Sequence, residues 1–301
     1  MRCRIGVFAT VACLAAGGAF AQVRQGQDDR NDSETPDKSI HETRQGQAGA
    51  ARVNSSLIRY HNGPVISGTV KVYYIWYGNW TNSPAQTILG NLANSIGNSP
   101  YFNINTTYYS TPPQTSVSGA VLNGGSVFDN YSHGTSLSDA AIQAIVTAQI
   151  NSHALPNDPN GVYFVLTSAD VNETSGFCSQ YCGWHTYGTI AGSTIKYAFV
   201  GNPARCLSAC AQQSTSPNGD AGADGMASII AHELEESVTD PLLNAWYDGR
   251  GYENADKCAW NFGTTYKAAN GSLANVNLGG LNYLIQQNWL NVGNGSCAMH
   301  P

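Results

Sequence analysis

The chain has 301 residues, a formal net charge of −6 and only 11% charged residues. It carries no basic stripe, which excludes nucleic acid as an expected partner. Beyond the N-terminal apolar run, no stretch approaches the ~20 apolar residues of a transmembrane helix, which excludes a membrane-spanning protein. The length is sufficient for one sizeable core or two closely packed lobes.

Residues 1–21 have the pattern of a secretory signal peptide. Arg2 and Arg4 precede an apolar, Ala-rich run, and Ala19-Phe20-Ala21 fits the small-x-small cleavage pattern. A membrane anchor is the alternative, but the run is short and polar residues follow it at once. We therefore expect a secreted, extracellular protein, located in a cell wall or periplasm where the source has one.

Export determines how the cysteines are interpreted. Cys3 and Cys13 leave with the signal peptide. The six that remain are Cys178, Cys182, Cys206, Cys210, Cys258 and Cys297. An even number in an oxidising compartment predicts three disulfides, whose connectivity the sequence leaves open. The two Cys-x3-Cys pairs would suggest zinc ligands in a cytosolic protein, but here they favour disulfides.

Residues 22–52 are polar, with almost no large apolar side chain. Such a segment buries too little surface to offset its ordering entropy, so we expect it to be disordered. Both a cleavable pro-segment and a plain linker fit this pattern. The folded domain is expected over residues 53–301.

Strands and helices alternate through that domain. The predicted strands are Val70–Tyr77, Gly161–Leu166 and Ile195–Val200, with a further extended stretch at Tyr101–Tyr109. The predicted helices are Pro84–Ile96, Leu137–Leu155 capped by Ser136, and Gly225–Thr239 capped by Asp224. Together they predict an α/β or α+β fold with a central sheet flanked by helices.

The last of these helices carries candidate metal ligands. His232 and Glu236 are four positions apart and therefore project from the same helical face. The zinc-protease signature His-Glu-x-x-His uses this spacing, with its Glu as general base; here Glu236 replaces the second His, and Glu233 is the candidate base. Pro241 ends the helix. A plain hydrogen-bonded surface pair is the alternative, and Glu235 is expected to be solvent-exposed in either case.

Further ligands are sought downstream. Glu253 and Asp256 follow the helix closely enough to return to it, and Asp256 or Asp240 could orient a ligand. The predicted cofactor is a divalent metal, zinc in particular, bound by His232, Glu236, Glu253 and Asp256. His185 is a candidate additional ligand, with a structural hydrogen bond as the alternative.

Two other groups are weaker candidates. Asn218, Asp220 and Asp224 resemble part of a calcium loop but lack its closing Glu, so turn and capping roles are expected. The aromatic residues around the first strand could form a sugar platform, although core packing is the expected use of those that face inward. These residues are Tyr74, Trp76, Tyr77 and Trp80.

Several motifs in one order resemble the EXORDIUM or phosphate-induced protein 1 family over roughly residues 55–300. The motifs are Val72-Tyr-Tyr-Ile-Trp-Tyr-Gly-Asn-Trp80, Gly176-Phe-Cys178, Cys182-Gly-Trp-His185, Tyr197-Ala-Phe-Val-Gly-Asn202, Asn218-Gly-Asp-Ala-Gly-Ala-Asp-Gly-Met226, Thr239-Asp-Pro241 and Asn244-Ala-Trp-Tyr247. The resemblance implies export and, in plants, a cell-wall location linked to growth and nutrient status, with no established biochemical activity. Many plant members vary at the His-Glu positions, so this chain resembles a branch that retains a metal-type helix.

Two functions follow. One is a secreted metal-dependent hydrolase, zinc metallopeptidase-like, with Glu233 as catalytic base. The other is a non-catalytic extracellular or cell-wall factor of the EXORDIUM type, involved in growth or nutrient signalling. The expected partner is an extracellular peptide or a cell-wall polymer.

Overall fold

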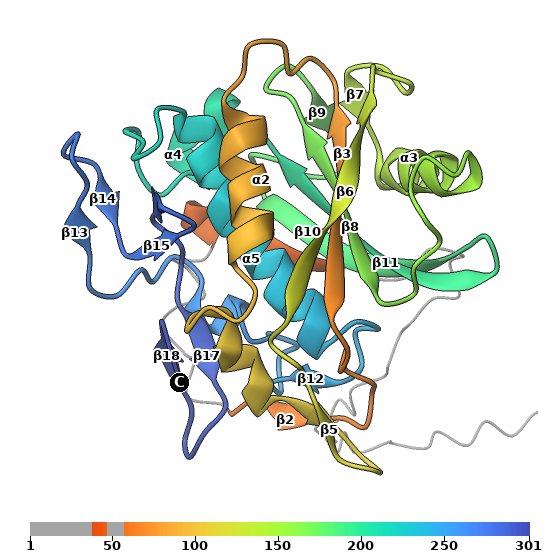
Figure 1. Cartoon of the computed structure of the whole chain (residues 1–301), viewed down its shortest axis with the longest axis vertical. Helices are drawn as coiled ribbons and strands as arrows, with labels where there is room; N and C mark the ends of the chain where they lie inside the picture. The colour runs from red at the N-terminus through yellow and green to blue at the C-terminus, as the bar shows by residue number, and fades with distance from the viewer. Residues whose placement is uncertain (1–37, 47–56) are drawn as a thin grey trace, which may run out of the picture. The chain divides into compact units, whose positions relative to one another are not determined.

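A computed structural model describes residues 38–46 and 57–301, which are built around a six-stranded mixed sheet (Figure 1). Its strands are β1 (Ser39–Glu42), β3 (Val70–Tyr77), β6 (Val121–Asp129), β8 (Gly161–Thr167), β10 (Tyr181–Ile190) and β11 (Ser193–Gly201). They lie in the order β1-β10-β11-β8-β3-β6. Strands β11, β8, β3 and β6 are parallel, whereas β10 is antiparallel to both of its neighbours. The predicted signal peptide lies outside the described residues.

Helices cover both faces of this sheet. The α-helices are α2 (Ala85–Ser95), α3 (Asp139–Asn151), α4 (Leu207–Cys210) and α5 (Ala221–Thr239). The 3₁₀ helices are η2 (Phe102–Thr107), η3 (Pro203–Arg205) and η4 (Asp256–Cys258). Residues of α2 and α5 share one hydrophobic cluster with the sheet, and residues of α3 share the other. The predicted fold class, a central sheet flanked by helices, is confirmed.

Short two-stranded pairs surround this core. They are β2 (Arg59–Tyr60) with β12 (Trp246–Tyr247), β4 (Tyr109–Ser110) with β5 (Thr115–Ser116), β7 (Ser136–Leu137) with β9 (Asn172–Glu173), β13 (Tyr266–Lys267) with β14 (Leu273–Ala274), β15 (Val276–Leu278) with β16 (Leu281–Tyr283), and β17 (Asn288–Leu290) with β18 (Ser296–Ala298). In the described part of the chain, no helix is long and apolar enough to cross a membrane.

Strand β3 is apolar almost throughout because both of its faces are buried. Alternate side chains face opposite sides of a strand. Tyr74 and Trp76 therefore join the cluster of α2 and α5, while Tyr73 and Ile75 join the cluster of α3. A strand buried on both faces has no polar side, as is usual in parallel sheets with helices on both faces. Tyr74, Trp76 and Tyr77, weak candidates for a sugar platform, are core residues, which is the use expected of those that face inward.

The two long helices begin where different caps place them. Helix α3 is capped by Ser138 instead of the predicted Ser136, and the Ser138 side chain accepts a hydrogen bond from the backbone of Ala141. Helix α5 begins at Ala221, capped by Asp220, so the capping role predicted for Asp224 is wrong. Asp224 lies in the first turn, where Asn218 donates to it through both its backbone and its side chain.

The stretch predicted to be extended at Tyr101–Tyr109 forms 3₁₀ helix η2, so that prediction is wrong. Its composition is β-branched and aromatic, which favours strands. However, the side chains of Asn105, Thr106 and Thr107 each donate to the carbonyl three residues earlier. These local bonds stabilise a helical turn in place of a sheet ladder.

Three disulfides join the six cysteines of the described residues. The pairs are Cys178–Cys206, Cys182–Cys210 and Cys258–Cys297. The predicted number is confirmed, and the connectivity that the sequence left open is now defined. Such bonds persist in oxidising compartments, which fits an extracellular protein.

Strand β1 lies in the segment that was expected to be disordered. It pairs antiparallel with β10, so that Ser39 lies opposite His185 and His41 opposite Gly183. Its affinity for the sheet comes from backbone pairing with an edge strand, which requires no apolar composition. The rest of the predicted disordered segment, residues 22–37 and 47–52, lies outside the described residues.

Candidate metal centre

Helix α5 is buried along nearly its whole length, so its acidic residues lie inside the protein. His232, Glu233 and Glu236 each expose 0% of their surface. Glu235 is equally buried and accepts a hydrogen bond of 3.0 Å from the hydroxyl of Tyr101, so its predicted exposure is wrong. Burial raises the pKa of Glu235 well above its ordinary value.

One group of candidate ligands forms around His232. Its Nε2 atom lies 3.0 Å from Glu236 Oε1 and 3.4 Å from Asp256 Oδ1. Two ligand atoms about 2.1 Å from one zinc ion, at a tetrahedral angle, lie about 3.4 Å apart. The three residues are therefore spaced as ligands of a single ion.

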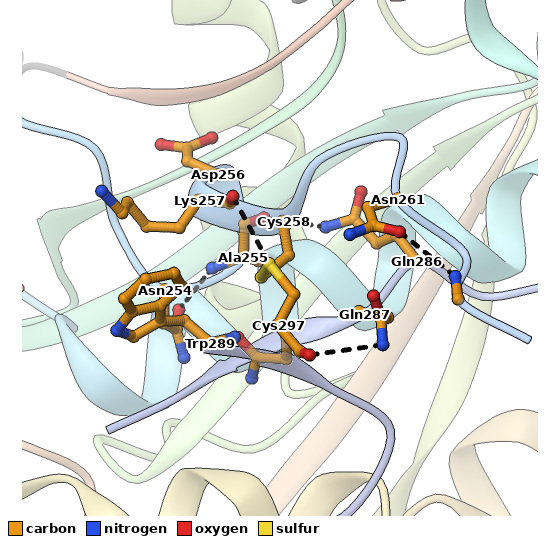
Figure 2. Close-up of a disulfide and its surroundings, with 12 residues drawn as sticks. Asn254, Ala255, Asp256, Lys257, Cys258, Asn261, Gln286, Gln287, Trp289 and Cys297 are labelled. Atoms are coloured by element: carbon orange, nitrogen blue, oxygen red, sulfur yellow. Dashed lines mark hydrogen bonds between the residues drawn. A yellow bond between two sulfur atoms is a disulfide. The ribbon is translucent and has the colours of Figure 1, made fainter. Parts of the chain in front are cut away.

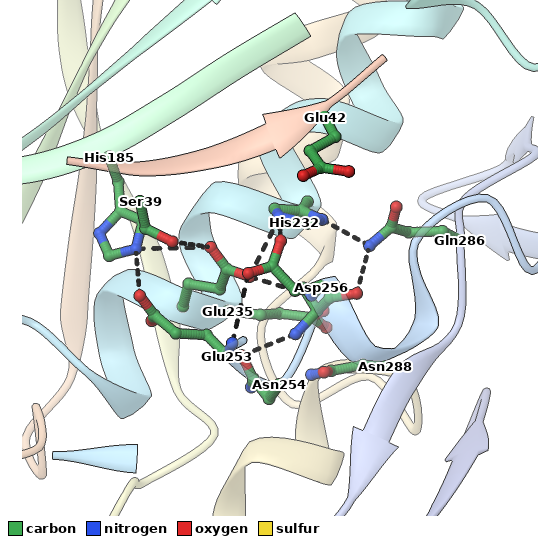
Figure 3. Close-up of polar contacts among 12 residues, drawn as sticks. Ser39, Glu42, His185, His232, Glu235, Glu253, Asn254, Asp256, Gln286 and Asn288 are labelled. Atoms are coloured by element: carbon green, nitrogen blue, oxygen red, sulfur yellow. Dashed lines mark hydrogen bonds and ion pairs between the residues drawn. The ribbon is translucent and has the colours of Figure 1, made fainter. Parts of the chain in front are cut away.

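A second group forms around His185, which projects from β10. Its Nε2 atom lies 3.4 Å from Glu236 Oε2 and 3.4 Å from Glu253 Oε1. Glu233 also offers an oxygen to this group. Figure 3 shows His185 beside Glu253, and His232 beside Asp256. Of the four predicted metal ligands, the structure thus brings His232, Glu236 and Asp256 together, whereas Glu253 faces His185.

The loop that carries Glu253 and Asp256 is tied to its surroundings. The backbone N–H of Asp256 donates to Glu236 Oε1 at 3.0 Å, and that of Glu253 donates to Asp256 Oδ2 at 3.3 Å. The Cys258–Cys297 disulfide joins the end of η4 to β18, next to this loop (Figure 2). The loop is therefore held both by hydrogen bonds to carboxylates of the cluster and by a disulfide beside it.

The charges of the cluster are strongly coupled. Burial lowers the pKa of both His185 and His232, but nearby carboxylates outweigh this effect. The largest of their contributions comes from Glu253 at His185 and from Glu236 at His232, and both pKa values are held well above the ordinary value. Burial raises the pKa of Asp256, and Glu236 adds to this, to about 6. Burial also raises the pKa of Glu253 well above its ordinary value. Burial also raises the pKa of Glu236, but His232 and His185 outweigh it and hold this pKa below its ordinary value.

His232 has a partner on its other ring nitrogen. Its Nδ1 atom lies 2.6 Å from Nε2 of Gln286, whose amide also donates to the carbonyl of Ala255 at 3.1 Å. A metal at His232 Nε2 requires the ring proton on Nδ1, so that Gln286 accepts it through Oε1 after a half-turn of the amide, which gives up the hydrogen bond to Ala255. Binding of a metal at His232 therefore requires a particular orientation of the Gln286 amide.

Strand β1 covers the cluster. The Ser39 hydroxyl lies 3.4 Å from Glu236 Oε2. The His41 ring lies 4.1 Å from the ring of His232 and stacks on Trp260 at 5.2 Å. The indole N–H of Trp260 donates to the carbonyl of Glu42. With β1 in place, the cluster is enclosed rather than lying at the floor of an open groove.

Asp240 has a structural position at the end of α5. Its Oδ1 atom accepts hydrogen bonds of 2.6 Å from the backbone of both Asn244 and Ala245. It therefore holds the turn after α5, and neither candidate ligand group includes it.

A surface hollow of about 400 Å³ lies at the carboxyl ends of β3 and β6, away from the cluster. It is lined by aromatic and amide side chains, including Phe128, Tyr131, Asn79 and Asn130. Trp80, a weak candidate for a sugar platform, also lines this hollow but is only 4% exposed, whereas Phe128 is 61% exposed. Phe128 was not among the predicted candidates, because no strand was predicted at β6.

Comparison with known proteins places the chain in a family. It matches the phosphate-induced protein 1 conserved region over residues 58–288. The chain belongs to this family. Protein EXORDIUM-like 3 of Arabidopsis thaliana is 36% identical over 278 residues, which cover 79% of this chain and 82% of the relative.

Two further relatives agree. EXORDIUM-like 5 of Arabidopsis thaliana is 34% identical, with 77% of this chain and 75% of the relative covered. PHOSPHATE-INDUCED 1 of Nicotiana tabacum is 29% identical, with 65% and 68% covered. No solved structure matches the chain. The phosphate-induced protein 1 region contains every residue of both ligand groups, whereas β1 lies outside it.

Proposed function

We propose that this protein is an extracellular factor of the EXORDIUM type, acting in growth or nutrient signalling, whose interior binds a divalent cation. His232, Glu236 and Asp256 bind the ion, and zinc is the ion we expect. The observation that carries this proposal is the spacing of these three ligand atoms, 3.0 and 3.4 Å from His232 Nε2. Membership of the family supports the extracellular factor.

The chemistry of the cluster supports a cation. Buried carboxylates are costly unless they are paired or bind a metal. His232 Nε2 is fully buried, and its near polar neighbours are the carboxylates of Glu236 and Asp256. Imidazole and carboxylate together are ordinary zinc ligands.

Metal analysis of the purified mature protein tests the proposal. We expect bound zinc in the wild type and loss of it in His232→Ala. His133→Ala is the matched control, because His133 is an exposed histidine outside the cluster, and it should keep its metal. A wild-type protein that binds no divalent metal would overturn the proposal.

Metal-dependent hydrolysis, zinc metallopeptidase-like, is the second candidate. Both carboxylate oxygens of Glu233 lack a hydrogen-bond partner beside the ligand groups, as a general base awaiting water would. The cover formed by β1 favours the non-catalytic factor. Glu233→Gln separates the two: the factor keeps both its metal and its effect on growth of the native host, whereas the hydrolase keeps its metal and loses its activity.

The partner of such a factor is proposed to be a cell-wall polymer bound at the hollow beside Phe128. Exposed aromatic faces and amide groups suit a neutral sugar, which offers C–H faces and hydroxyls but no charge. Calorimetric titration with wall oligosaccharides should show binding to the wild type and a loss of at least about tenfold in Phe128→Ala, since about 1.4 kcal/mol corresponds to tenfold. Equal affinities for wild type and variant would remove this surface as the binding site, and an extracellular peptide would be the next partner to test.

A further inference from the structure

We infer that the cluster binds a second divalent cation, held by His185, Glu236 and Glu253, so that Glu236 bridges two ions. This inference rests on the proposed metal at His232 and extends it from a mononuclear to a dinuclear centre. The second ligand set comes from three elements: β10, α5 and the loop before η4.

The two oxygens of Glu236 face different histidines. Oε1 lies 3.0 Å from His232 Nε2, and Oε2 lies 3.4 Å from His185 Nε2. A carboxylate that presents one oxygen to each of two imidazoles is placed as a bridge. Ions bridged in this way lie about 3.5–4 Å apart in two-metal sites.

Glu253 is placed for the second ion and not for the first. Its Oε1 atom lies 3.4 Å from His185 Nε2, the same spacing that joins His232 to Asp256. Each histidine thus lies near one oxygen of the shared Glu236 and near a carboxylate of its own, Asp256 for His232 and Glu253 for His185. Glu233 offers a further oxygen on the His185 side.

Unpartnered atoms point into the second site. His185 is 0% exposed, and neither of its ring nitrogens has a hydrogen-bond partner. Both oxygens of Glu233 are also unpartnered, as is Oε2 of Glu253. Buried polar groups in native proteins are nearly always satisfied, so several such atoms in one place indicate a bound species.

The balance of charge can accommodate two ions. The cluster contains four carboxylates, from Glu233, Glu236, Glu253 and Asp256, and two imidazoles. Two divalent cations with neutral imidazoles neutralise all four carboxylates, whereas one cation requires that two of the carboxylates keep a proton. An uncompensated buried charge is strongly destabilising.

Metal stoichiometry tests the second site directly. The mature protein is loaded with zinc, dialysed against metal-free buffer and analysed for ions per chain. We expect about two ions in the wild type, as in other two-metal sites, and about one in His185→Ala. His232→Ala should also retain about one, and Glu236→Gln should lose most of both because it removes the bridge. His133→Ala again serves as control and should match the wild type.

Paramagnetic loading gives a second readout that needs no variant. With Mn²⁺ in place of zinc, the wild type should show the broadened resonance of two coupled ions, and His185→Ala the signal of an isolated ion. If the wild type holds one ion, His185→Ala still holds one and His232→Ala holds none, the second site is overturned while the proposed function stands. A wild type without any metal overturns both. If His185→Ala does not fold, the coupled or uncoupled Mn²⁺ signal of the wild type decides alone.

Discussion

Gly183 is a residue of β10 that lies directly against α5. A Cβ atom there would lie 2.6 Å from the Ile229 side chain, 2.9 Å from the carbonyl of Phe199 and 3.0 Å from Glu233 Oε1. Gly183→Ala should therefore push β10 and α5 apart. We expect a loss of about 1–3 kcal/mol in the free energy of unfolding, the usual cost of overpacking, and weaker metal binding. Urea unfolding and metal titration measure the two effects.

The matched control for that substitution is Gly68→Ala. A Cβ atom at Gly68 meets nothing within 4 Å. This variant should keep the wild-type stability within about 0.5 kcal/mol, as surface substitutions usually do, and bind metal normally. Equal behaviour of the two alanine variants would contradict a close approach at Gly183.

Lys196 gives the protein a pH dependence independent of the metal ligands. Burial lowers the pKa of its ammonium group from 10.5 to about 8, against the opposing effect of Asp158. Between about pH 8 and 10.5 the unfolded chain therefore binds more protons than the folded one. Stability should rise with pH across this window, because the cost of burying a charged Lys196 is full below about pH 8 and disappears as the group deprotonates.

The variant Lys196→Met isolates this effect. Its stability relative to the wild type should fall by about 2–3 kcal/mol as the pH rises from 7 to 10, since one pKa unit corresponds to about 1.4 kcal/mol. The hydrogen bond from Lys196 to the Pro159 carbonyl is lost in this variant at every pH, so it adds only a constant offset to the difference in stability. The measurement is the unfolding free energy of variant and wild type at several pH values. A difference between the two that stays constant up to pH 10 would mean that Lys196 remains charged in the folded state, which would contradict the prediction.

At the scale of elements, the loop that carries Glu253 and Asp256 depends on the Cys258–Cys297 disulfide. This bond closes a sequence separation of 39 residues. Replacing both cysteines by Ser should cost about 3–4 kcal/mol of stability by the chain-entropy account and should also weaken metal binding, because the loop loses its anchor. Differential calorimetry and metal titration report the two losses separately.

A second disulfide provides the control. Cys178–Cys206 closes a separation of 28 residues and joins neither ligand group directly. The corresponding double Ser variant should lose a comparable amount of stability and keep its metal affinity. Equal losses of affinity in both variants would mean that the loop is not specifically anchored by Cys258.

Strand β1 is the element that controls access to the cluster. Deleting residues 22–46 from the mature protein removes Ser39 and His41 from above Glu236 and His232. A chelator should then strip the metal at least about tenfold faster, because exchange no longer requires local opening of a paired strand. His41→Ala, which keeps the strand, should show a smaller increase, and an unchanged rate in the deletion variant would mean that the metal leaves by another route.

The elements that the sequence predicted well are those with a strong local pattern. Val70–Tyr77 is a strand and Ala85–Ser95 a helix, within a residue of the prediction. Strands β6 and β10 were missed, because β6 contains Gly124 and Gly125 and β10 contains glycines that interrupt a strand pattern. Strand β1 has no local signal at all, since it is stabilised by pairing with the edge of β10.

In the candidate site, too, only the positions that follow from a local pattern could be predicted. The positions of His232 and Glu236 on one face follow from helical periodicity alone. The position of Glu253 beside His185 could not be predicted, because His185 comes from a strand that precedes α5 by a long stretch of chain. Had β10 been predicted, the alternation of side chains along a strand would have placed His185 and Trp184 on opposite faces of the sheet. Trp184 packs in the α3 cluster, so His185 would have been expected to face α5.

For the whole molecule, the cluster concentrates buried charge at the centre of the fold. Helix α5 contacts β10, β11, α2 and η2, so the helix that carries His232 and Glu236 also contributes to the hydrophobic core. A species that binds the folded state but not the unfolded state stabilises the folded state by mass action. Metal binding and global stability should therefore be coupled.

Removing the metal should lower the melting temperature of the whole protein. At a free ion concentration of 100 to 1,000 times the Kd, the stabilisation is about 3–4 kcal/mol. A domain of about 150–250 residues changes its Tm by about 2–4 °C per kcal/mol, so a chelator should lower the Tm by roughly 6–16 °C. Scanning calorimetry with and without chelator measures this shift, and readdition of zinc should reverse it. Glu236→Gln, which lacks the central ligand, should melt lower than the wild type and respond little to chelator. A chelator effect of the same size in that variant would show that the stabilising ion binds elsewhere in the chain.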